Sequence, residues 1–395
     1  FGCVLDDKKI KATKRLFFTA TARILSQDVK TKSLNSDFDV ASMDDPNLFG
    51  EVFYHLKFSS AIQAKLLSDY RVIIIGVNDE MIKQQIFNRK IIITDQMQLT
   101  DAETYASIIA LTKAIKDYGL EKLITFHRRI SGAKHFSETI TRNPPKIADN
   151  LKKIGKINCD FISGKMRVIE RNLKLNELRN EEIGTTKILS NARCLSEGID
   201  LPILDGIAFI DPKQSQIDII QAVGRAIRKS TEDSLSYIVL PIYLSDIEKI
   251  DYEIKNRNFE KIWKVLLALK SQDDSLMEII DQLRIALGEN NKIRLSGDDL
   301  PKIIIDFPDQ VDQKFVDSIR NYLIRGASEN WLESYGELKK FYLINGHSNF
   351  PQDGSNLASW VSNQRSNFKI GKLTKKRQRL LEEINFIWDI KEHFW

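Results

Sequence analysis

The stretch GIAFIDPKQSQIDIIQAVGRAIRK, residues 206–229, places a short apolar run directly before a longer amphipathic one. The short run, residues 206–210, is strand-sized, and in the longer run the apolar residues recur every three or four positions, which is the period of a helix. Ser215 stands three residues before Asp218, and this pattern predicts a capping box at the start of a helix over residues 215–229. The stretch therefore predicts one strand-to-helix unit.

Units of the same kind lie on both sides of this stretch. Strands that alternate with helices predict βαβ units and a mostly parallel sheet, an α/β fold whose ligands usually bind at the carboxyl ends of the strands. The apolar residues 16–18 predict one further strand, without sequence neighbours that could pair with it. The other predicted strands are residues 53–58, 71–77, 122–127, 186–189 and 236–240, and the other predicted helices are residues 101–118 and 132–141.

Length and composition exclude several classes of protein. With 395 residues, 42% hydrophobic and 29% charged, the chain is large enough for two or three domains that each bury a core. Its longest apolar runs are strand-sized, and residues 6–9 are charged where a signal peptide would be apolar, which favours a cytoplasmic protein without a membrane span. Three widely spaced cysteines predict neither a disulfide framework nor a metal site. The net charge of +5 is compatible with an anionic partner.

The chain divides into four regions by composition. Residues 1–50 carry a lone strand and its exit loop, so we expect the chain to begin inside a domain. Residues 51–245 hold the alternating strands and helices, and residues 246–328 are mostly helical, with one run, LPKIIIDFPD, that fits a short strand. Residues 329–395 carry four of the five tryptophans, which predicts a small, mostly α-helical C-terminal domain with tryptophan in its core.

Three polar side chains share one face of the predicted central helix. Gln221, Arg225 and Arg228 stand at i, i+4 and i+7, so a helix through all three puts two guanidinium groups on one line. Gly224 lies beside them, where most residues would favour the helix by about 1 kcal/mol, and its missing side chain lets another group approach the backbone. Composition alone favours a solvated face, because charged side chains are mostly exposed. The residues before the helix favour an anion site instead.

Those residues resemble the motifs of a known family. SEGIDLP (residues 196–202), FIDP (209–212) and QAVGRAIR (221–228) resemble, in this order, motifs V and VI in the second RecA-like domain of superfamily 2 DEAD/DEAH-type helicases. LFFTATAR (16–23) resembles motif III at the end of the first RecA-like domain, and ITFHRRI (124–130) resembles motif IV. The motifs are collinear, which makes the resemblance more specific than any one of them.

The tail supplies a second resemblance. Residues 331–388 are similar to the helicase-associated domain that follows the motor domains of bacterial, plasmid and phage helicases. Together the two resemblances assign each region of the chain. Residues 1–50 would be a remnant of the first RecA-like domain, 51–245 the second RecA-like domain, 246–328 a helical connector, and 329–395 the helicase-associated domain.

The resemblance implies that this chain supplies arginines to an ATP molecule held by the first RecA-like domain. Arg225 and Arg228 would face the γ-phosphate, where an arginine finger raises the rate by about 10³–10⁵, and Gln221 would orient them or the attacking water. Asp200 would meet the ribose or couple to the arginines. Gly198 and Gly224 would let the nucleotide approach the backbone. The implied cofactors are ATP and magnesium, with no metal ligand in this chain.

The resemblance also implies nucleic acid as a partner, with DNA favoured over RNA. Arg128 and Arg129 follow a predicted strand and suit contacts with phosphates, although a solvated loop explains them equally well. His127 closes the same strand and fits a structural role as well as a functional one. Asn191 stands where the family usually has a threonine that contacts phosphate. The implied contacts outside the tail are Thr19, Thr21, Arg128, Arg129, Ser163, Gly164 and Asn191.

The tail carries a run of basic residues, between Asn363 and Arg379, that contains no acidic residue. Basic side chains near aromatic ones suit a phosphate backbone with exposed bases, and a solvated face is the alternative. The expected nucleic-acid contacts in this run are Arg365, Lys369, Lys372, Lys375, Lys376 and Arg377.

Two elements of a complete ATPase are missing from this sequence. It contains no GxxxxGK[ST] P-loop and no DEAD or DEAH box, so it lacks a phosphate cradle and magnesium ligands. We therefore expect the C-terminal part of a longer ATP-dependent helicase or translocase, inactive as an ATPase without its first RecA-like domain in cis. The alternatives are a non-enzymatic nucleic-acid-binding module and a restriction-system DNA translocase subunit.

Overall fold

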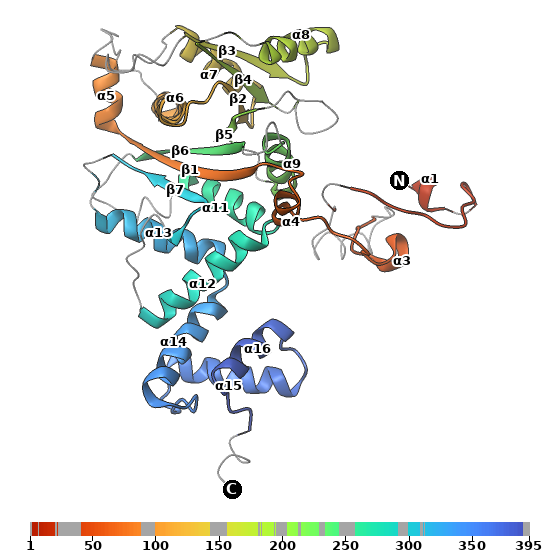
Figure 1. Ribbon diagram of the computed structural model, residues 1–395, viewed down its shortest axis with the longest axis vertical. Helices are drawn as coiled ribbons and strands as arrows, with labels where there is room; N and C mark the ends of the chain where they lie inside the picture. Colours follow the sequence, from red (N-terminus) through yellow and green to blue (C-terminus); the bar gives the residue numbers. More distant parts are fainter. Residues whose placement is uncertain are drawn as a thin grey trace.

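The strands of the chain form one parallel sheet. The computed structural model describes residues 2–6, 8–19, 22, 41–87, 99–142, 156–180, 182, 184–192, 194, 204–211, 215–228, 234–244, 257–290, 299–308, 311 and 313–389. In these residues seven strands pair in the order β3-β4-β2-β5-β6-β1-β7, and every pair is parallel (Figure 1). The strands are β1 (Asp69–Asn78), β2 (Lys122–His127), β3 (Lys156–Ser163), β4 (Thr185–Ala192), β5 (Gly206–Asp211), β6 (Leu235–Leu244) and β7 (Ile303–Asp306).

Helices cover both faces of this sheet. One face packs against α5, α6 and α7, and the other packs against α8, α9, α11 and α13 (Figure 1). The main helices are α5 (Asp79–Phe87), α6 (Leu99–Tyr118), α7 (Ile130–Arg142), α8 (Val168–Arg179), α9 (Gln216–Ala226), α11 (Arg257–Lys270), α12 (Asp274–Asn290), α13 (Gln313–Ala327), α14 (Asn330–Asn345), α15 (Asn356–Lys369) and α16 (Lys375–Glu383). Three short helices, α1 (Gly2–Leu5), α3 (Pro46–Phe49) and α4 (Phe58–Gln63), precede β1.

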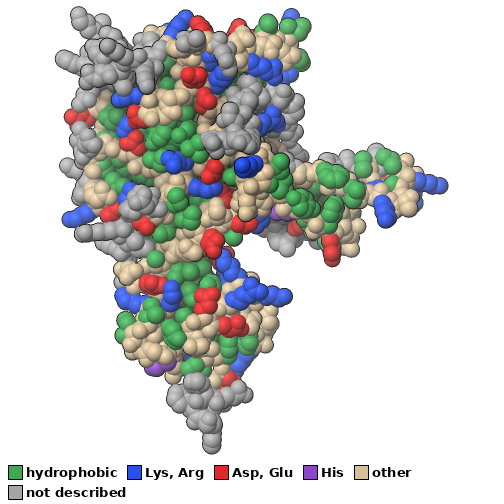
Figure 2. Space-filling model, in the orientation of Figure 1, with side chains coloured by type: hydrophobic (Ala, Val, Ile, Leu, Met, Phe, Trp, Pro, Cys, Tyr) green, Lys and Arg blue, Asp and Glu red, His purple; other side chains and the backbone are tan. Residues whose placement is uncertain are grey.

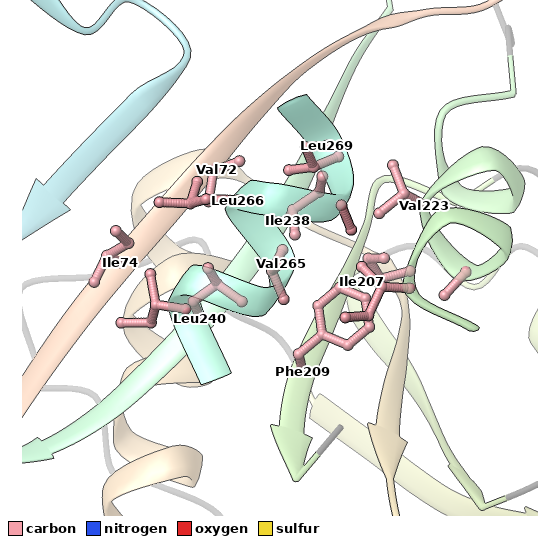
Figure 3. Close-up of a cluster of buried hydrophobic side chains, with 14 of the residues drawn as sticks. Val72, Ile74, Ile207, Phe209, Val223, Ile238, Leu240, Val265, Leu266 and Leu269 are labelled. Atoms are coloured by element: carbon pink, nitrogen blue, oxygen red, sulfur yellow. The ribbon is translucent and has the colours of Figure 1, made fainter. Parts of the chain in front are cut away.

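The apolar run of β1 explains how one strand serves two cores. Successive side chains of a strand point to opposite faces, so an uninterrupted apolar run suits a strand that is covered on both sides. Ile73 and Ile75 belong to the core beneath α6. Val72 and Ile74 belong to the core beneath α9 and α11, which Figure 3 shows. The α/β fold predicted from the sequence is confirmed.

The structure corrects several predicted elements. Residues 16–18 and 53–58 form no strand: Phe18 is 84% exposed, Phe53 is 73% exposed, and no described residue pairs with either run in a sheet. An apolar run becomes a strand only where a neighbour takes up its backbone hydrogen bonds. Conversely, β3 was not predicted, because its sequence, KINCDFIS, mixes polar and apolar residues. The ambiguous run LPKIIIDFPD does supply a strand, β7, which pairs with β1.

The predicted helix over residues 215–229 is shorter than expected. Ser215 has the extended backbone of an N-cap residue, but its side chain makes no capping hydrogen bond, so the capping box was wrong. The helix, α9, ends at Ala226, and Ile227 follows it in a non-helical conformation. Its apolar side, with Val223 fully buried, packs on the sheet as predicted.

Helices α14, α15 and α16 enclose a core of their own. Trp331 lies in that core with Leu338 and Leu381, and Trp360 and Trp388 pack against it, in line with the prediction. The indole Nε1 of Trp331 donates to Oε1 of Gln364 at 2.8 Å, which satisfies its buried polar atom. Residues beyond 389 lie outside the described chain. The small α-helical unit expected after the connector is therefore present.

The junction between α12 and α14 is unusually close. A Cβ atom added to Gly288 would lie 2.0 Å from the carbonyl oxygen of Glu333, and one added to Gly336 would lie 2.0 Å from the carbonyl oxygen of Ile285. The two helix backbones thus touch where neither carries a side chain. An ion pair of 2.7 Å between Arg284 and Glu333 closes the same contact. The domain boundary at residue 329 stays a prediction.

Candidate functional site

The three residues predicted to share a helix face occupy two different settings. Gln221 and Arg225 lie on α9 and are half-buried. Arg228 lies two residues beyond the helix end, where it forms an antiparallel bridge with Leu67. The expected line of side chains at i, i+4 and i+7 was therefore wrong for Arg228, because the helix stops before it.

The arginines lie near the amino ends of the strands, whereas the sequence predicted only in general that ligands bind at the carboxyl ends. The backbone N–H of Ser68, directly before β1, donates to the carbonyl of Ile227 at 2.9 Å. The hydroxyl of Ser236, at the start of β6, donates to the carbonyl of Ala226 at 3.1 Å. The end of α9 thus adjoins the amino ends of β1 and β6, not the carboxyl ends of the strands.

Gly224 is covered by a ring of this chain. A Cβ atom added at Gly224 would lie 3.7 Å from two ring atoms of Phe58 in α4, which is ordinary van der Waals contact. Phe58 is itself anchored, because its backbone N–H donates to the carbonyl of Gln272 at 2.7 Å. The segment that leads into β1 therefore lies against the arginine-bearing helix.

A second set of predicted residues does gather at the carboxyl edge. Strands β3, β4 and β2 are neighbours, and Ser163, Ala192 and His127 lie side by side in their register. The residues that follow, Arg128, Arg129 and Gly164, are exposed. Arg128 forms a long ion pair of 3.8 Å with Asp211, at the end of the next strand.

Two members of this carboxyl-edge set are buried. Ser163 is buried and its carbonyl closes a turn by accepting from the N–H of Met166 at 3.1 Å. Asn191 is also buried, and its side-chain carbonyl accepts from the N–H of Cys194 at 3.2 Å. Their contact with nucleic acid stays a prediction, and the residues next to them are more accessible.

His127 has the setting of a structural residue. It is buried, its Nε2 lies 3.0 Å from the hydroxyl of Thr125, and that hydroxyl lies 2.9 Å from the hydroxyl of Ser190. Burial lowers the pKa of His127 to about 3, so its imidazole is neutral at physiological pH. Of the two alternatives that the sequence left open, the structure favours the structural one.

Some basic side chains of the tail form ion pairs or hydrogen bonds within the chain, and others are exposed without an ion pair to a described residue. Arg365 is 9% exposed, donates to the carbonyl of Ile387 at 2.9 Å and stacks on Phe386, so it belongs to the domain core. Lys376 pairs with Asp281 of α12 at 2.8 Å. Arg377 pairs with Glu329 at 2.6 Å and lies over the ring of Trp331. Lys369 pairs loosely with Asp389 at 3.8 Å.

Three other basic residues of the run are exposed. Lys372, Lys375 and Arg379 have no ion pair with any residue that the structure describes. Figure 2 shows Lys and Arg side chains gathered near α16. Arg379 was not among the residues predicted to contact nucleic acid, although it belongs to the same run, because the prediction stopped at Arg377. These three side chains form what we call the α16 basic surface.

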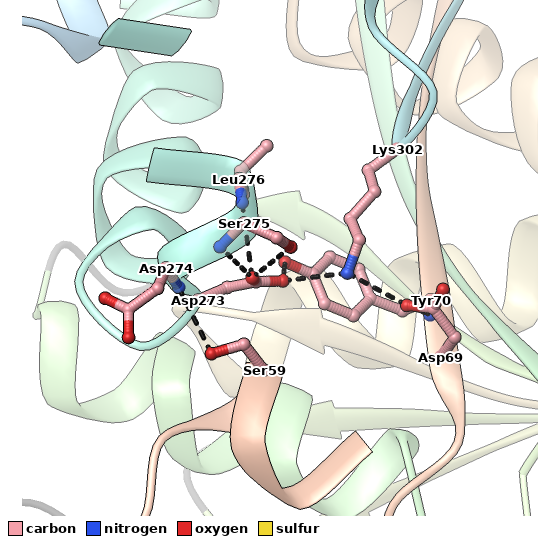
Figure 4. Close-up of polar contacts among 8 residues, drawn as sticks. All are labelled: Ser59, Asp69, Tyr70, Asp273, Asp274, Ser275, Leu276 and Lys302. Carbon is pink, nitrogen blue, oxygen red and sulfur yellow. Dashed lines mark hydrogen bonds and ion pairs between the residues drawn. The ribbon is translucent and has the colours of Figure 1, made fainter. Parts of the chain in front are cut away.

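A buried polar cluster, not predicted from the sequence, fastens the start of β1 to the start of α12 (Figure 4). Asp273 is fully buried and accepts from the hydroxyl of Tyr70 at 2.7 Å and from Lys302 at 2.9 Å. Next to it, Asp274 pairs with Lys57 at 2.6 Å. The residues of this cluster are far apart in the sequence, so no local sequence pattern predicts the cluster.

Three predicted site residues, Thr21, Gly198 and Asp200, lie outside the described residues. Thr19 is exposed, in a segment without helix or strand. Within the described residues no three His, Cys, Asp or Glu side chains are grouped to hold a metal ion, so we assign no magnesium ligand to them. No helix in the described part of the chain is long and apolar enough to cross a membrane.

Comparison with known proteins matches both halves of the chain. Models of two families, the helicase conserved C-terminal domain and the helicase associated domain, match residues 107–230 and 328–389. A protein of Sulfolobus islandicus filamentous virus named as a helicase is 29% identical over 156 residues, which covers 40% of this chain and 24% of that protein. A protein of African swine fever virus named as a probable helicase is 25% identical over 242 residues, which covers 59% of this chain and 23% of that protein.

The fold also matches a solved structure. The ATP-dependent Type ISP restriction-modification enzyme LlaBIII bound to DNA has a TM-score of 0.57 and 22% identity, and the match covers 89% of this chain and 26% of that one. This chain spans about a quarter of the length of the proteins it matches. The sheet and its two helical layers have the fold of a RecA-like domain. Residues 107–230 therefore match a helicase conserved C-terminal domain, which is followed at residues 328–389 by a match to a helicase associated domain.

Proposed function

We propose that this chain is the C-terminal part of an ATP-dependent nucleic-acid helicase or translocase. Arg225 and Arg228 would stabilise the charge on the γ-phosphate of an ATP held by the first RecA-like domain, with Gln221 orienting them. The observation that supports this most directly is the end of α9, where Arg228 is fixed by its neighbours outside the helix and Arg225 stays half-exposed in the last turn. ATP and magnesium would be held mainly by the first domain.

The separation of the two residue sets supports two different ligands. The arginines adjoin the amino ends of β1 and β6, whereas Arg128, Arg129 and Gly164 follow the carboxyl ends of β2 and β3. A nucleotide at one edge and a nucleic-acid backbone at the other would not compete for space. The proposal also includes Gly198 and Asp200 as residues beside the nucleotide. It includes Thr19 and Thr21 as contacts with the nucleic-acid strand.

We propose DNA as the preferred nucleic acid. A structure of similar fold, LlaBIII, is a DNA-bound restriction-modification enzyme. A restriction-system translocase is for that reason a specific alternative within the same class. A linked nuclease or methyltransferase gene would favour it.

A non-enzymatic nucleic-acid-binding module is the alternative from another class. It would keep the fold and the α16 basic surface without ATP hydrolysis. The coding sequence upstream of Phe1 discriminates between the two functions, because a P-loop and an acidic box in frame are required for the enzyme.

The arginine assignment is tested in the protein that carries both RecA-like domains. Arg228→Ala is expected to lower ATP turnover by about 10³ or more, the range for an arginine finger, and to leave nucleic-acid affinity nearly unchanged. This chain alone is expected to show no nucleic-acid-stimulated hydrolysis. Equal turnover in the wild type and Arg228→Ala, or hydrolysis by this chain alone, would contradict the proposal.

The nucleic-acid assignment is tested by the salt dependence of binding. Replacing Lys372, Lys375 and Arg379 by alanine removes three exposed charges and should reduce the slope of log K against log salt by roughly 2 to 3 for duplex DNA. A matched control replaces Lys116, Lys134 and Arg142, which lie on α6 and α7. The same loss in both variants would indicate only an effect of net charge.

A further inference from the structure

The carboxyl end of α9 is held by three hydrogen bonds from outside the helix. The carbonyl of Ala226 accepts from the hydroxyl of Ser236 at 3.1 Å, and the carbonyl of Ile227 accepts from the N–H of Ser68 at 2.9 Å. The carbonyl of Arg228 accepts from the hydroxyl of Ser68 at 3.4 Å. Three successive carbonyls are thus satisfied by the segments that begin β6 and β1.

This ending differs from the usual end of a helix. The last carbonyls of a helix commonly bind water, or a glycine in the left-handed conformation ends the helix. Here Ile227 has φ −85° and ψ 23°, so no left-handed residue turns the chain. The strands that flank the helix end determine the direction in which Arg228 leaves it.

The two serines are built into the protein as fixed groups. Ser68 is 4% exposed and Ser236 is 2% exposed. The hydroxyl of Ser68 also lies 2.6 Å from the hydroxyl of Ser234, which ties the approach to β6 to the same point. A buried hydroxyl that reaches a backbone carbonyl has one well-defined geometry, because leaving either group without a partner is costly.

From these contacts we infer that Ser68 and Ser236 are positioning residues for Arg228. They act through the backbone of residues 226–228 and set the direction of the Arg228 side chain relative to Arg225 on the helix. The inference rests on the proposed function, because it concerns the arginines that would face the γ-phosphate. A misplacement of about 1 Å in a group that acts on the transition state can cost as much as about 100-fold in rate.

The test uses the protein that carries both RecA-like domains and compares kcat with KM. Ser68→Ala combined with Ser236→Ala is expected to lower kcat for ATP about 10-fold, with a KM close to that of the wild type. The matched control is Ser107→Ala: Ser107 is also buried and donates to a helix carbonyl, that of Glu103 at 2.8 Å, but on α6. The control is expected to keep the wild-type kcat.

A double-mutant cycle separates positioning from a general loss of structure. In the Arg228→Ala background, the two serine substitutions are expected to cause no further loss of single-turnover hydrolysis, because their effect passes through Arg228. Full additivity, or wild-type kcat in the serine variant, would overturn the inference while leaving the proposed function intact. Wild-type turnover in Arg228→Ala would instead overturn the proposed function.

If the double serine variant is unfolded, Ser68→Ala alone provides the test. It keeps the backbone N–H that binds Ile227 and removes the hydroxyl that contacts the carbonyl of Arg228 and the hydroxyl of Ser234. Its thermal unfolding is compared with that of Ser107→Ala. A variant as stable as this control, with lower kcat and no further loss in the Arg228→Ala background, supports the inference; unchanged kcat contradicts it.

Discussion

Two helix contacts of this protein involve glycine, and they differ in the space left for a Cβ atom. At the junction of α12 and α14, a Cβ on Gly288 or Gly336 would lie 2.0 Å from a backbone oxygen of the other helix. On α9, a Cβ on Gly224 would lie 3.7 Å from the Phe58 ring. Real Cβ atoms cannot approach a backbone to 2.0 Å, whereas 3.7 Å is an ordinary contact. Packing therefore requires glycine at the junction but not at Gly224.

The comparison distinguishes glycines that helix packing requires, Gly288 and Gly336, from Gly224, which packing does not require. At the junction the backbones must be in contact, so a side chain would push two helices apart. At Gly224 the described residues leave room for a methyl group, although glycine costs the helix about 1 kcal/mol relative to alanine. We propose that the nucleotide expected near Arg225 is what favours the glycine.

The largest effect is expected for Gly336→Ala. Forcing a methyl group against the carbonyl of Ile285 should cost about 3 kcal/mol or more of the free energy of unfolding, at or above the upper end for overpacked cores. Denaturant titration of this chain measures it. Gly132→Ala in α7 is the control, because a Cβ there meets nothing within 4 Å. A loss no larger than in the control would contradict the close contact.

An intermediate effect is expected for Asp273→Asn, at the turn that joins α11 to α12. Burial alone would raise the pKa of Asp273, but hydrogen bonds from Ser275, Lys302 and Tyr70 outweigh it and hold the pKa below the ordinary value. Loss of this charged acceptor should cost roughly 2 kcal/mol at neutral pH. Asp274→Asn, whose partner Lys57 is on the surface, is the control and should cost less.

The pH dependence of unfolding checks the same residue. Because the folded pKa of Asp273 lies below the unfolded value of about 3.9, its contribution is fully present above that value and is lost as pH falls through the folded pKa. The wild type should therefore lose more stability than Asp273→Asn between neutral pH and pH values below about 4. Parallel curves for the two proteins would contradict the lowered pKa.

The smallest effect on stability is expected for Gly224→Ala. Its free energy of unfolding should stay within about 1 kcal/mol of the wild type, with a shift toward greater stability from the better helix former. In the protein with both RecA-like domains, ATP turnover should nevertheless fall. A destabilisation as large as that of Gly336→Ala would show that packing on Phe58 determines the glycine, and the comparison would then fail.

Local sequence patterns predicted the strands and helices whose buried side chains recur at a regular period. The apolar run of β1 and the apolar stripe of α9 were recognised because burial fixes their periodicity. The run at residues 53–58 is also rich in strand-forming residues but has no partner strand, and partners are not visible in a local pattern. The residues at the end of α9 bind Ser68, which is 160 residues from Arg228 in sequence, so this contact is not visible in a local pattern.

The candidate site shows the same limit: local sequence identified its residues but not their contacts with distant segments. Resemblance identified Gln221, Arg225 and Arg228, and the structure places Gln221 in the middle of α9, Arg225 in its last turn and Arg228 just beyond its end. The resemblance could not show that Arg365 is held in the core, or that Lys376 and Arg377 form ion pairs within the chain, because those contacts join distant segments. Arg379 belongs to the same basic run, and a contact of this run with nucleic acid stays a prediction.

The contact between α12 and α14 also has a mechanical consequence. Helix α14 has 16 residues and is about 24 Å long, and it starts where its backbone is locked against α12. The ion pairs of Lys376 with Asp281 and of Arg377 with Glu329 tie α16 to the same junction, so we expect α12, α14 and α16 to move as one rigid unit. A rotation of α12 would then carry the α16 basic surface with it, without a hinge between the two.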